Sequence, residues 1–237
     1  MTVSTATSIV PFASPDGTPT TDVSPFSEVL DYVTLMNYDV WGTWSPAVGP
    51  NAPLDDTCAP PQYQQGSATS AIAAWTRAGF PANKLVLGVG SYGHSYFVSQ
   101  ENAFAGATPS APQPPGTTPL AAYPPFDASQ QPLGDSWDAD APAGTDVCGN
   151  PTPGGPSGIF NFRGLIEKGL LAADGTPAAG MGFRFDNCSQ TVSVGDTARW
   201  TWLTHRSRMC TTRRRRRWCP TTTRCLFVSR NFLLVAE

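Results

Sequence analysis

Apolar residues recur with helical spacing between residues 67 and 78. One face of this segment carries apolar side chains at positions i, i+3, i+4 and i+7, namely Ala68, Ala71, Ile72 and Trp75. This spacing is typical of an amphipathic helix that packs one face against a core. Gly79 and Pro81 follow as stop signals. The pattern therefore predicts a helix over residues 67 to 78.

Two other segments show shorter helical patterns. Ser24 is a candidate N-cap, with Pro25 in the first turn of a short helix. The apolar residues that share one face of this helix are Phe26, Val29 and Leu30. A later helix is indicated by the spacing of Phe162, Leu165, Ile166 and Leu170.

Three segments between these helices predict strands. Leu85 to Val89 is a continuous apolar run, as expected for a parallel strand that is buried on both faces. Residues 32 to 36 are rich in β-forming residues, and residues 8 to 12 form a shorter apolar stretch that we assign to the preceding strand. Strand, loop, helix and strand follow one another, with polar residues directly after the strand ends. This order predicts an α/β fold built from βα repeats.

The pattern changes after Tyr96, where about sixty residues are rich in Pro, Gly and Ala. A stretch of that length inside a compact domain is a functional loop, an inserted subdomain or a poorly ordered segment. We interpret it as an insertion after the strand that ends near Gly90.

The formal net charge of −3 conceals a break in composition near Thr191. Residues 1 to 190 contain 5 Lys and Arg against 16 Asp and Glu, a net of −11, whereas residues 191 to 237 contain 10 Arg against 2 acids, a net of +8. The run Arg213 to Arg217 has three interpretations. It is a nuclear localisation signal or nucleic-acid-binding segment, a solvated charge run, or the product of translation past a frameshift or unspliced intron. The abrupt change favours the last interpretation, so nucleic acid is not an expected partner.

The sequence also bears on the compartment. No apolar run approaches the roughly 20 residues of a membrane-spanning helix, so no membrane partner is expected. The first residues show no signal-peptide pattern. Cys58, Cys148 and Cys188 would suit one disulfide and one thiol in an oxidising compartment, although the sequence cannot assign the pair. Asn187-Cys188-Ser189 is an N-glycosylation sequon, which matters only on a secretory route.

The most specific motif follows the predicted strand at residues 32 to 36. Leu35-Met36-Asn37-Tyr38-Asp39 is followed by Gly42, Trp44 and then Asn51-Ala52-Pro53-Leu54. This arrangement resembles glycoside hydrolase family 18, the chitinase-type (β/α)8 barrels, whose sixth strand ends in Met-x-Tyr-Asp before a Gly/Trp loop and a Pro-Leu. Residues 84 to 93 resemble the seventh strand of that family. Asp135-Ser136-Trp137 and Val147-Cys148-Gly149 resemble pieces of the insertion in its fungal members.

The resemblance covers about residues 1 to 190 and implies a partial TIM barrel. We expect about strands five to seven of the barrel over residues 1 to 95, an α+β insertion subdomain over residues 96 to 190, and an irregular basic tail over residues 191 to 237. A complete barrel typically needs about 250 residues, so the chain is expected to be the C-terminal part of a catalytic domain. The family implies an extracellular location.

The resemblance also implies a substrate and its contacts. In family 18 the N-acetyl oxygen of the substrate attacks the anomeric carbon, which is an exception to the scheme with two carboxylates. Tyr38 and Asp39 would orient the acetamido group, Met36 would line the pocket floor, and Trp44 would stack on a sugar ring. Tyr92 is the fifth expected contact. Trp41 either joins this site or is buried in the loop. Chitin or N-acetylglucosamine oligosaccharides are the expected partners.

The general acid of the family is not found in this sequence. Its motif is Asp-x-x-Asp-x-Asp-x-Glu, but the matching spacing at Asp135, Asp138 and Asp140 has Pro142 at the position of the acid. We assign this segment to a solvated insertion loop and expect no catalytic residue in the chain. The chain is therefore predicted to be a chitinase-type hydrolase fragment that is inactive alone. The alternative is a lectin-like remnant in which Tyr38, Asp39, Trp44 and Tyr92 hold the sugar.

Two further patterns are weaker. His94 stands where the family usually has Arg, and a largely neutral His puts the substrate contacts at that position in doubt, so it is either structural or part of the site. Gly88 to Gly93 matches Gly-x-Gly-x-x-Gly, but the residues that follow are β-prone and give no helix to hold a pyrophosphate. No His/Cys group has zinc spacing. No metal site or cofactor is expected.

Overall fold

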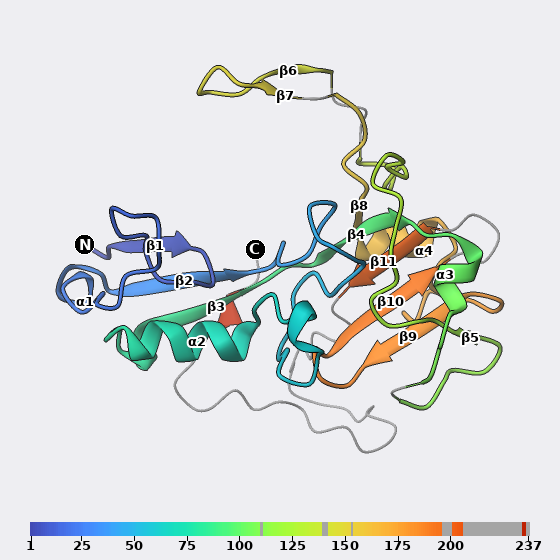
Figure 1. Ribbon diagram of the computed structural model, residues 1–237, viewed down its shortest axis with the longest axis horizontal. Helices are drawn as coiled ribbons and strands as arrows, with labels where there is room; N and C mark the ends of the chain where they lie inside the picture. Colours follow the sequence, from blue (N-terminus) through green and yellow to red (C-terminus); the bar gives the residue numbers. More distant parts are fainter. Residues whose placement is uncertain (110, 139–141, 153, 196–200, 206–233, 236–237) are drawn as a thin grey trace.

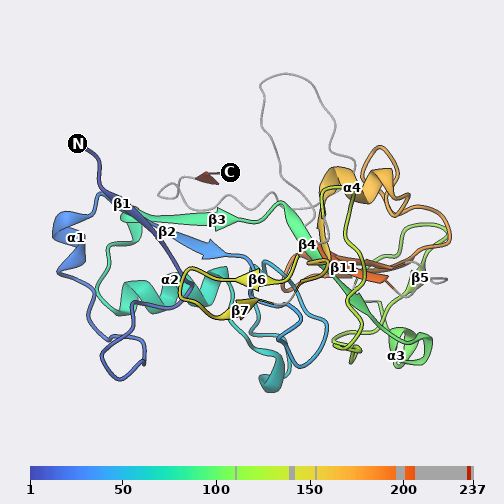
Figure 2. The same cartoon turned by 90° about the horizontal axis from the view of Figure 1, so that it is seen from above.

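The computed structural model describes residues 1–109, 111–138, 142–152, 154–195, 201–205 and 234–235. Within these residues the chain forms two main sheets of different character, which lie end to end (Figures 1 and 2). The charge run at residues 213 to 217 and three cysteines, Cys210, Cys219 and Cys225, lie outside the described residues. The interpretations of the tail therefore stay predictions.

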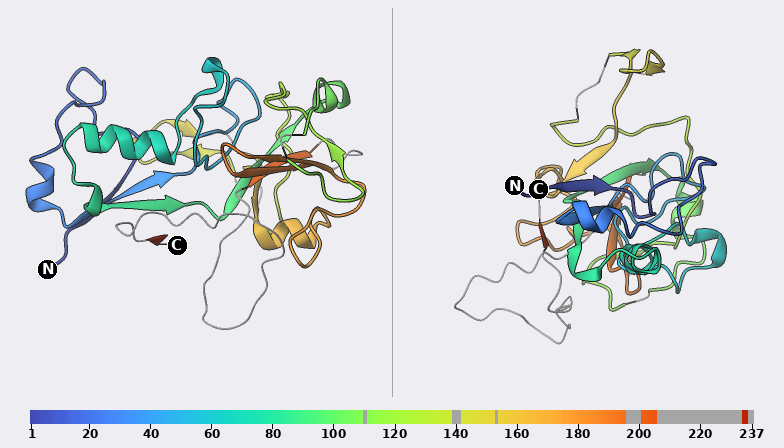
Figure 3. Two further views of the ribbon diagram at one scale, coloured as in Figure 1. Left: turned by 90° about the horizontal axis from the view of Figure 1, so that it is seen from below. Right: turned by 90° about the vertical axis from the view of Figure 1, so that its left-hand side faces the viewer.

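The first sheet is parallel and contains the predicted βα repeat. Its strand order is β1 (Ser4–Thr7), β2 (Tyr32–Asn37), β3 (Leu85–Val89) and β12 (Leu234–Val235). The helix α2 (Ala68–Arg77) connects β2 to β3 and covers one face of the sheet (Figure 3). Two short 3₁₀ turns, η1 (Pro61–Tyr63) and η2 (Ala82–Lys84), lie on either side of α2. The predictions for α2, β2 and β3 are confirmed.

Alternation of side chains along β2 builds the core under α2. Val33 and Leu35 are fully buried and pack with Leu85 of β3 and Trp75 of α2. Ser67 caps the helix by accepting a hydrogen bond from the backbone N–H of Ser70. The apolar spacing of α2 thus faces the sheet, as its sequence predicted.

Two details near the N-terminus correct the sequence predictions. The strand is β1, not residues 8 to 12, because Ile9 and Phe12 pack instead on the core beneath α2. The short helix α1 (Phe26–Val29) forms, but Pro25 is its N-cap and makes no side-chain cap bond. Ser24 donates its hydroxyl hydrogen to Asp22 Oδ1 at 2.6 Å, so this side chain stabilises the preceding turn.

The second sheet is antiparallel except at one edge. Its order is β5 (Thr118–Pro119), β9 (Gly182–Asp186), β10 (Thr191–Gly195), β11 (Thr201–His205), β4 (Tyr92–Phe97) and β8 (Ile159–Asn161), with only the β5–β9 pair parallel. Two short helices, α3 (Gln100–Phe104) and α4 (Phe162–Glu167), belong to two separate apolar clusters of this half. The helix predicted near residue 165 is confirmed as α4. A small hairpin of β6 (Gly144–Thr145) and β7 (Pro151–Thr152) projects away from both sheets (Figure 1).

The boundary that we predicted at residue 190 falls inside a hairpin. β10 begins at Thr191 and pairs with β9 over five residues, with Val192 and Val194 buried. β11 then pairs with both β10 and β4. The fold therefore continues through at least Gly195 and again through residues 201 to 205, and Val194 of β10 packs in the apolar cluster around Leu165.

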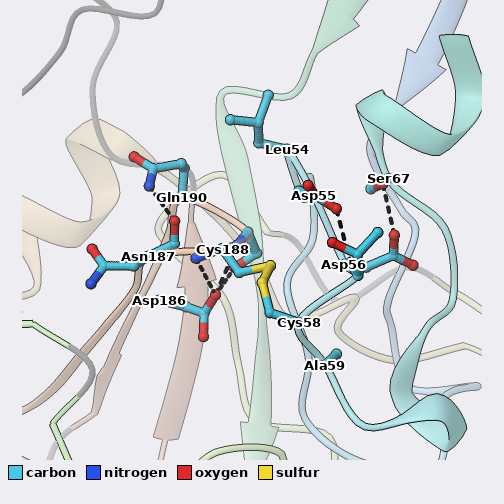
Figure 4. Close-up of a disulfide and its surroundings, with 12 residues drawn as sticks. Leu54, Asp55, Asp56, Cys58, Ala59, Ser67, Asp186, Asn187, Cys188 and Gln190 are labelled. Atoms are coloured by element: carbon cyan, nitrogen blue, oxygen red, sulfur yellow. Dashed lines mark hydrogen bonds between the residues drawn. A yellow bond between two sulfur atoms is a disulfide. The ribbon is translucent and has the colours of Figure 1, made fainter.

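A disulfide ties the loops of the first half to the second sheet. Cys58 and Cys188 are bonded across a sequence separation of 130 (Figure 4). Cys148 is a free, exposed thiol. The turn around Cys188 is ordered by Asp186, whose Oδ1 accepts hydrogen bonds from the backbone N–H groups of Cys188 and Ser189. The expectation of one disulfide and one thiol among these three cysteines is confirmed.

Candidate functional site

The site begins at a strained turn directly after β2. Asp39 has a φ of +54°, which is uncommon for a residue other than glycine. The buried side chain of Asn51 stabilises this conformation, because its Oδ1 accepts a hydrogen bond from the Asp39 backbone N–H at 2.9 Å. Asn51 Nδ2 donates to the Tyr92 carbonyl at 2.8 Å. One amide therefore joins the loop after β2 to the start of β4.

The carboxylate of Asp39 faces β4. His94 Nε2 lies 2.8 Å from Asp39 Oδ1, and the Tyr92 hydroxyl also forms a hydrogen bond with this carboxylate. The Asp39 side chain is 45% exposed, whereas the His94 side chain is 10% exposed. The hydrogen bond from His94 is the main reason that the pKa of Asp39 lies below its ordinary value. Asp39 is thus an ionised acceptor that is partly open to solvent.

Tyr92, His94 and Tyr96 occupy alternate positions of β4 and so share one face of the strand. Burial raises the pKa of the Tyr92 hydroxyl above its ordinary value, and its hydrogen bond to Asp39 raises this pKa further. Burial also raises the pKa of Tyr96, and the charge of Asp39 adds to this effect. The Tyr96 hydroxyl is buried and has no hydrogen-bond partner among the described residues. Both phenols therefore stay protonated beside the charged carboxylate.

Aromatic rings surround the carboxylate. The Trp44 side chain is 65% exposed and presents its ring edge-on to His94 at a centroid distance of 5.9 Å. Tyr38 meets Tyr92 edge-on at 6.2 Å. Met36 is half-buried on β2, opposite Gly88 of β3. A side chain at Gly88 would come close to the ring of Tyr38, which places Tyr38 beside Met36.

The predicted residues Tyr38, Asp39, Trp44 and Tyr92 thus come together around one carboxylate, with Met36 next to them. Trp41 does not join them. It is buried and packs against Tyr123 and Tyr63, whose rings stack on each other at 4.5 Å. The alternative in which Trp41 is buried in the loop is the one that the structure shows.

The segment that imitates the catalytic motif has a different role. Asp135 is buried and accepts hydrogen bonds from the backbone N–H groups of Trp137 and Asn161. Asp138 accepts from the backbone N–H groups of Gly134 and Gly158. Both carboxylates stabilise a loop beside β8. Our expectation of a solvated loop is therefore wrong for Asp135, which is buried and satisfies these backbone groups.

The glycine pattern at residues 88 to 93 leads from β3 into β4, so no helix begins there. Across the described residues, no group of three His, Cys, Asp or Glu side chains could hold a metal ion. In the same residues, no helix is long and apolar enough to cross a membrane.

A family model matches more than half of the chain. The model of glycosyl hydrolases family 18 matches residues 4–148. The chain belongs to this family. A chitinase-like effector of Moniliophthora roreri is 53% identical over 192 residues, which cover 81% of this chain and 44% of that protein. Chitinase 1 of Aphanocladium album is 36% identical over 89 residues, or 38% of this chain and 21% of that protein.

Solved structures of the family agree in fold. A chitinase from Rhizomucor miehei superposes with a TM-score of 0.65 at 27% identity, covering 85% of this chain and 49% of that chain. A class V chitinase from Nicotiana tobaccum superposes with a TM-score of 0.52 at 20% identity, covering 86% and 44%. The chain spans less than half the length of these relatives, and its two halves have the mixed α/β architecture of family 18.

Sequence reasoning missed one residue of the site and left the role of another open. Asn51 lies in the Asn-Ala-Pro-Leu motif that supported the family resemblance, yet no local pattern joins it to Tyr92, 41 positions away. For His94 we left a structural role and a site role open, and the structure places it against Asp39. Its alternation with Tyr92 along a β-prone run was the signal available in the sequence.

Proposed function

We propose that this chain binds oligosaccharides of β-1,4-linked N-acetylglucosamine at the cluster around Asp39 and does not hydrolyse them by itself. The observation that carries this proposal is the ionised, part-exposed carboxylate of Asp39, held by His94 and Tyr92 beside the exposed ring of Trp44.

The chemistry of the cluster suits an acetamido sugar. The amide N–H of such a sugar can donate a charge-assisted hydrogen bond to the Asp39 carboxylate. The face of Trp44 offers apolar area to the C–H groups of a sugar ring. The Tyr38 side chain adds an aromatic wall beside Met36. A mostly apolar surface with a few convergent polar groups is the usual composition of a small-ligand site.

We expect no turnover because the sequence lacks the motif that carries the general acid for the glycosidic bond. Removal of a general acid typically costs a factor of about 10² to 10⁴. Asp135 and Asp138 are occupied by backbone hydrogen bonds, and Pro142 stands where the acid would be. Asp39 would still stabilise and orient the acetamido group without a proton donor opposite it. The chain is in this view a chitinase-type fragment that keeps substrate contacts, and the same residues serve the lectin-like alternative.

The names of related proteins support the ligand class. Structures of the chitinases from Nicotiana tobaccum and Cycas revoluta contain NAG4 and (GlcNAc)3 respectively, although these proteins share only the fold with this chain. Two relatives that are 53% and 52% identical are called chitinase-like effectors.

For the architecture, we propose that β1, β2 and β3 correspond to strands five to seven of a (β/α)8 barrel. Their parallel order and the helix α2 between β2 and β3 support this assignment. The second sheet would then contain the insertion after the seventh strand, with β4 at its start. In this proposal the insertion extends beyond residue 190 to include β10.

We also propose an extracellular location. The Cys58–Cys188 disulfide supports an oxidising compartment, because structural disulfides are rare in the reducing cytosol.

Calorimetry with chitotetraose tests the binding. Replacement of the Asp39 carboxylate (Asp39→Ala) removes a hydrogen bond to a charged group, for which about 1.5 to 3 kcal/mol is typical, so we expect at least about tenfold weaker binding. Trp44→Ala is expected to weaken binding about three- to tenfold. Trp137→Ala is the matched control, because this tryptophan is 77% exposed on another loop.

Equal losses in Trp44→Ala and Trp137→Ala would contradict a site at Asp39. Release of shorter sugars from chitotetraose by the purified chain would overturn the absence of turnover.

A further inference from the structure

His94 is held more firmly than the residue it contacts. It lies inside β4, where its backbone pairs with Ile159 of β8 on one side and Thr204 of β11 on the other. Asp39 lies on a loop, and Asn51 fixes only its backbone N–H. The side chain of Asp39 therefore needs a separate contact to hold its rotamer, and His94 Nε2 at 2.8 Å supplies one from a rigid strand.

The proton on His94 can be assigned from the state of its partner. Asp39 is ionised, and a carboxylate only accepts hydrogen bonds. Nε2 must therefore carry a hydrogen, whether the ring is neutral or cationic. In the neutral ring this leaves Nδ1 without a proton.

We propose that His94 is a positioning residue, which holds Oδ1 of Asp39 through Nε2–H and thereby presents the other carboxylate oxygen, Oδ2, to the amide N–H of a bound acetamido sugar. This inference rests on the proposed function of the Asp39 cluster. It gives a role to the histidine that stands where the family usually has Arg.

The electrostatic surroundings favour this arrangement. The titratable and charged groups that lie near His94 among the described side chains are Asp39, from the loop after β2, and Tyr92 and Tyr96, from its own strand. The Trp44 ring, whose centroid lies 5.9 Å from that of His94, adds no charge. Asp39 makes no ion pair with a Lys or Arg among the described residues. The carboxylate is thus a strong acceptor for a sugar amide.

The test uses substitutions of His94 that place a hydrogen-bond donor either at the position of Nε2 or at the position of Nδ1. The amide nitrogen of Gln can reach the place of Nε2, whereas the amide nitrogen of Asn reaches only the place of Nδ1. We expect His94→Gln to bind chitotetraose within about threefold of the natural chain. We expect His94→Asn and His94→Leu each to bind about tenfold more weakly, as for the loss of a hydrogen bond to a charged group.

Thermal unfolding of each variant separates positioning from stability. A purely structural role would make affinity follow stability, with no advantage of Gln over Asn. Equal affinity of His94→Gln and His94→Asn, or unchanged affinity of His94→Leu, would overturn the inference and leave the proposed function standing. If the natural chain does not bind chitotetraose, the proposed function fails and the inference fails with it.

Nitrogen-15 NMR gives an independent measurement, because the chain has only two histidines. We expect the His94 ring in the neutral state to carry its hydrogen on Nε2, and Asp39→Ala to change the Nε2 chemical shift because the hydrogen bond to the carboxylate is lost. A ring with its hydrogen on Nδ1 in the natural chain would contradict the proposed hydrogen bond. His94→Leu identifies the resonance.

Discussion

The Cys58–Cys188 disulfide should contribute strongly to the stability of the fold. Its two cysteines are separated by 130 positions, so the bond closes a very long loop in the unfolded chain. The chain-entropy relation gives about 5 kcal/mol for a loop of this length at 25 °C. Replacement of both cysteines (Cys58→Ser with Cys188→Ser) is expected to lower the free energy of unfolding by several kcal/mol. This loss is a large part of the stability of an ordinary domain.

Urea unfolding followed by tryptophan fluorescence measures this loss. Cys148→Ser is the matched control, because Cys148 is a free and exposed thiol and its replacement should leave the midpoint unchanged. The backbone hydrogen bond from Leu54 N–H to the Ser189 carbonyl, 2.9 Å long, joins the same two segments and remains in the double variant. If the double variant unfolds at the same midpoint as Cys148→Ser, the entropic argument is refuted for this protein.

Three further predictions concern the site and the core. Acidification should leave glycan affinity unchanged until the pH falls below the ordinary Asp pKa of about 3.9, because the pKa of Asp39 is lowered in the fold. A calorimetric pH series checks this. In His94→Leu the loss of glycan affinity should begin at a higher pH, because the main cause of the lowered pKa is removed. The stability that ionised Asp39 contributes is likewise present above its unfolded pKa and lost as the pH falls through its folded pKa. Asn51→Ala should destabilise the fold by about 2 to 4 kcal/mol in urea unfolding, because it leaves two backbone partners unpaired, and an effect under 1 kcal/mol would show that water replaces the amide. Trp75→Ala should cost about 3 to 5 kcal/mol in the same assay, and an effect no larger than that of exposed Trp137→Ala would contradict the burial of Trp75.

Periodicity predicted the elements with strong local patterns. α2 and β3 were found because one has a clear apolar face and the other a continuous apolar run, and their burial depends on neighbours within the same βα unit. The second sheet was not found, because its strands are short and β4 pairs with β8 and β11 across long separations. The change in charge composition led us to predict a boundary at residue 190. The alternating valines of β10, directly after it, indicated the strand that the structure shows there.

The site was predictable only in part. Tyr38, Asp39 and Trp44 follow one strand and stood out through the family resemblance. His94 is 55 positions from Asp39, and no local pattern encodes that contact. The pairing depends on the way the chain passes from β3 to β4, with Gly90 and Ser91 between them.

This passage has a mechanical consequence for the protein. Asp39 follows a strand of the parallel sheet, whereas His94 and Tyr92 belong to the antiparallel sheet. A sugar that contacts both Asp39 and Tyr92 would therefore link the two halves of the molecule. Ligand binding is then coupled to the relative alignment of the two halves. A substitution that tilts one sheet against the other would therefore also change the glycan affinity.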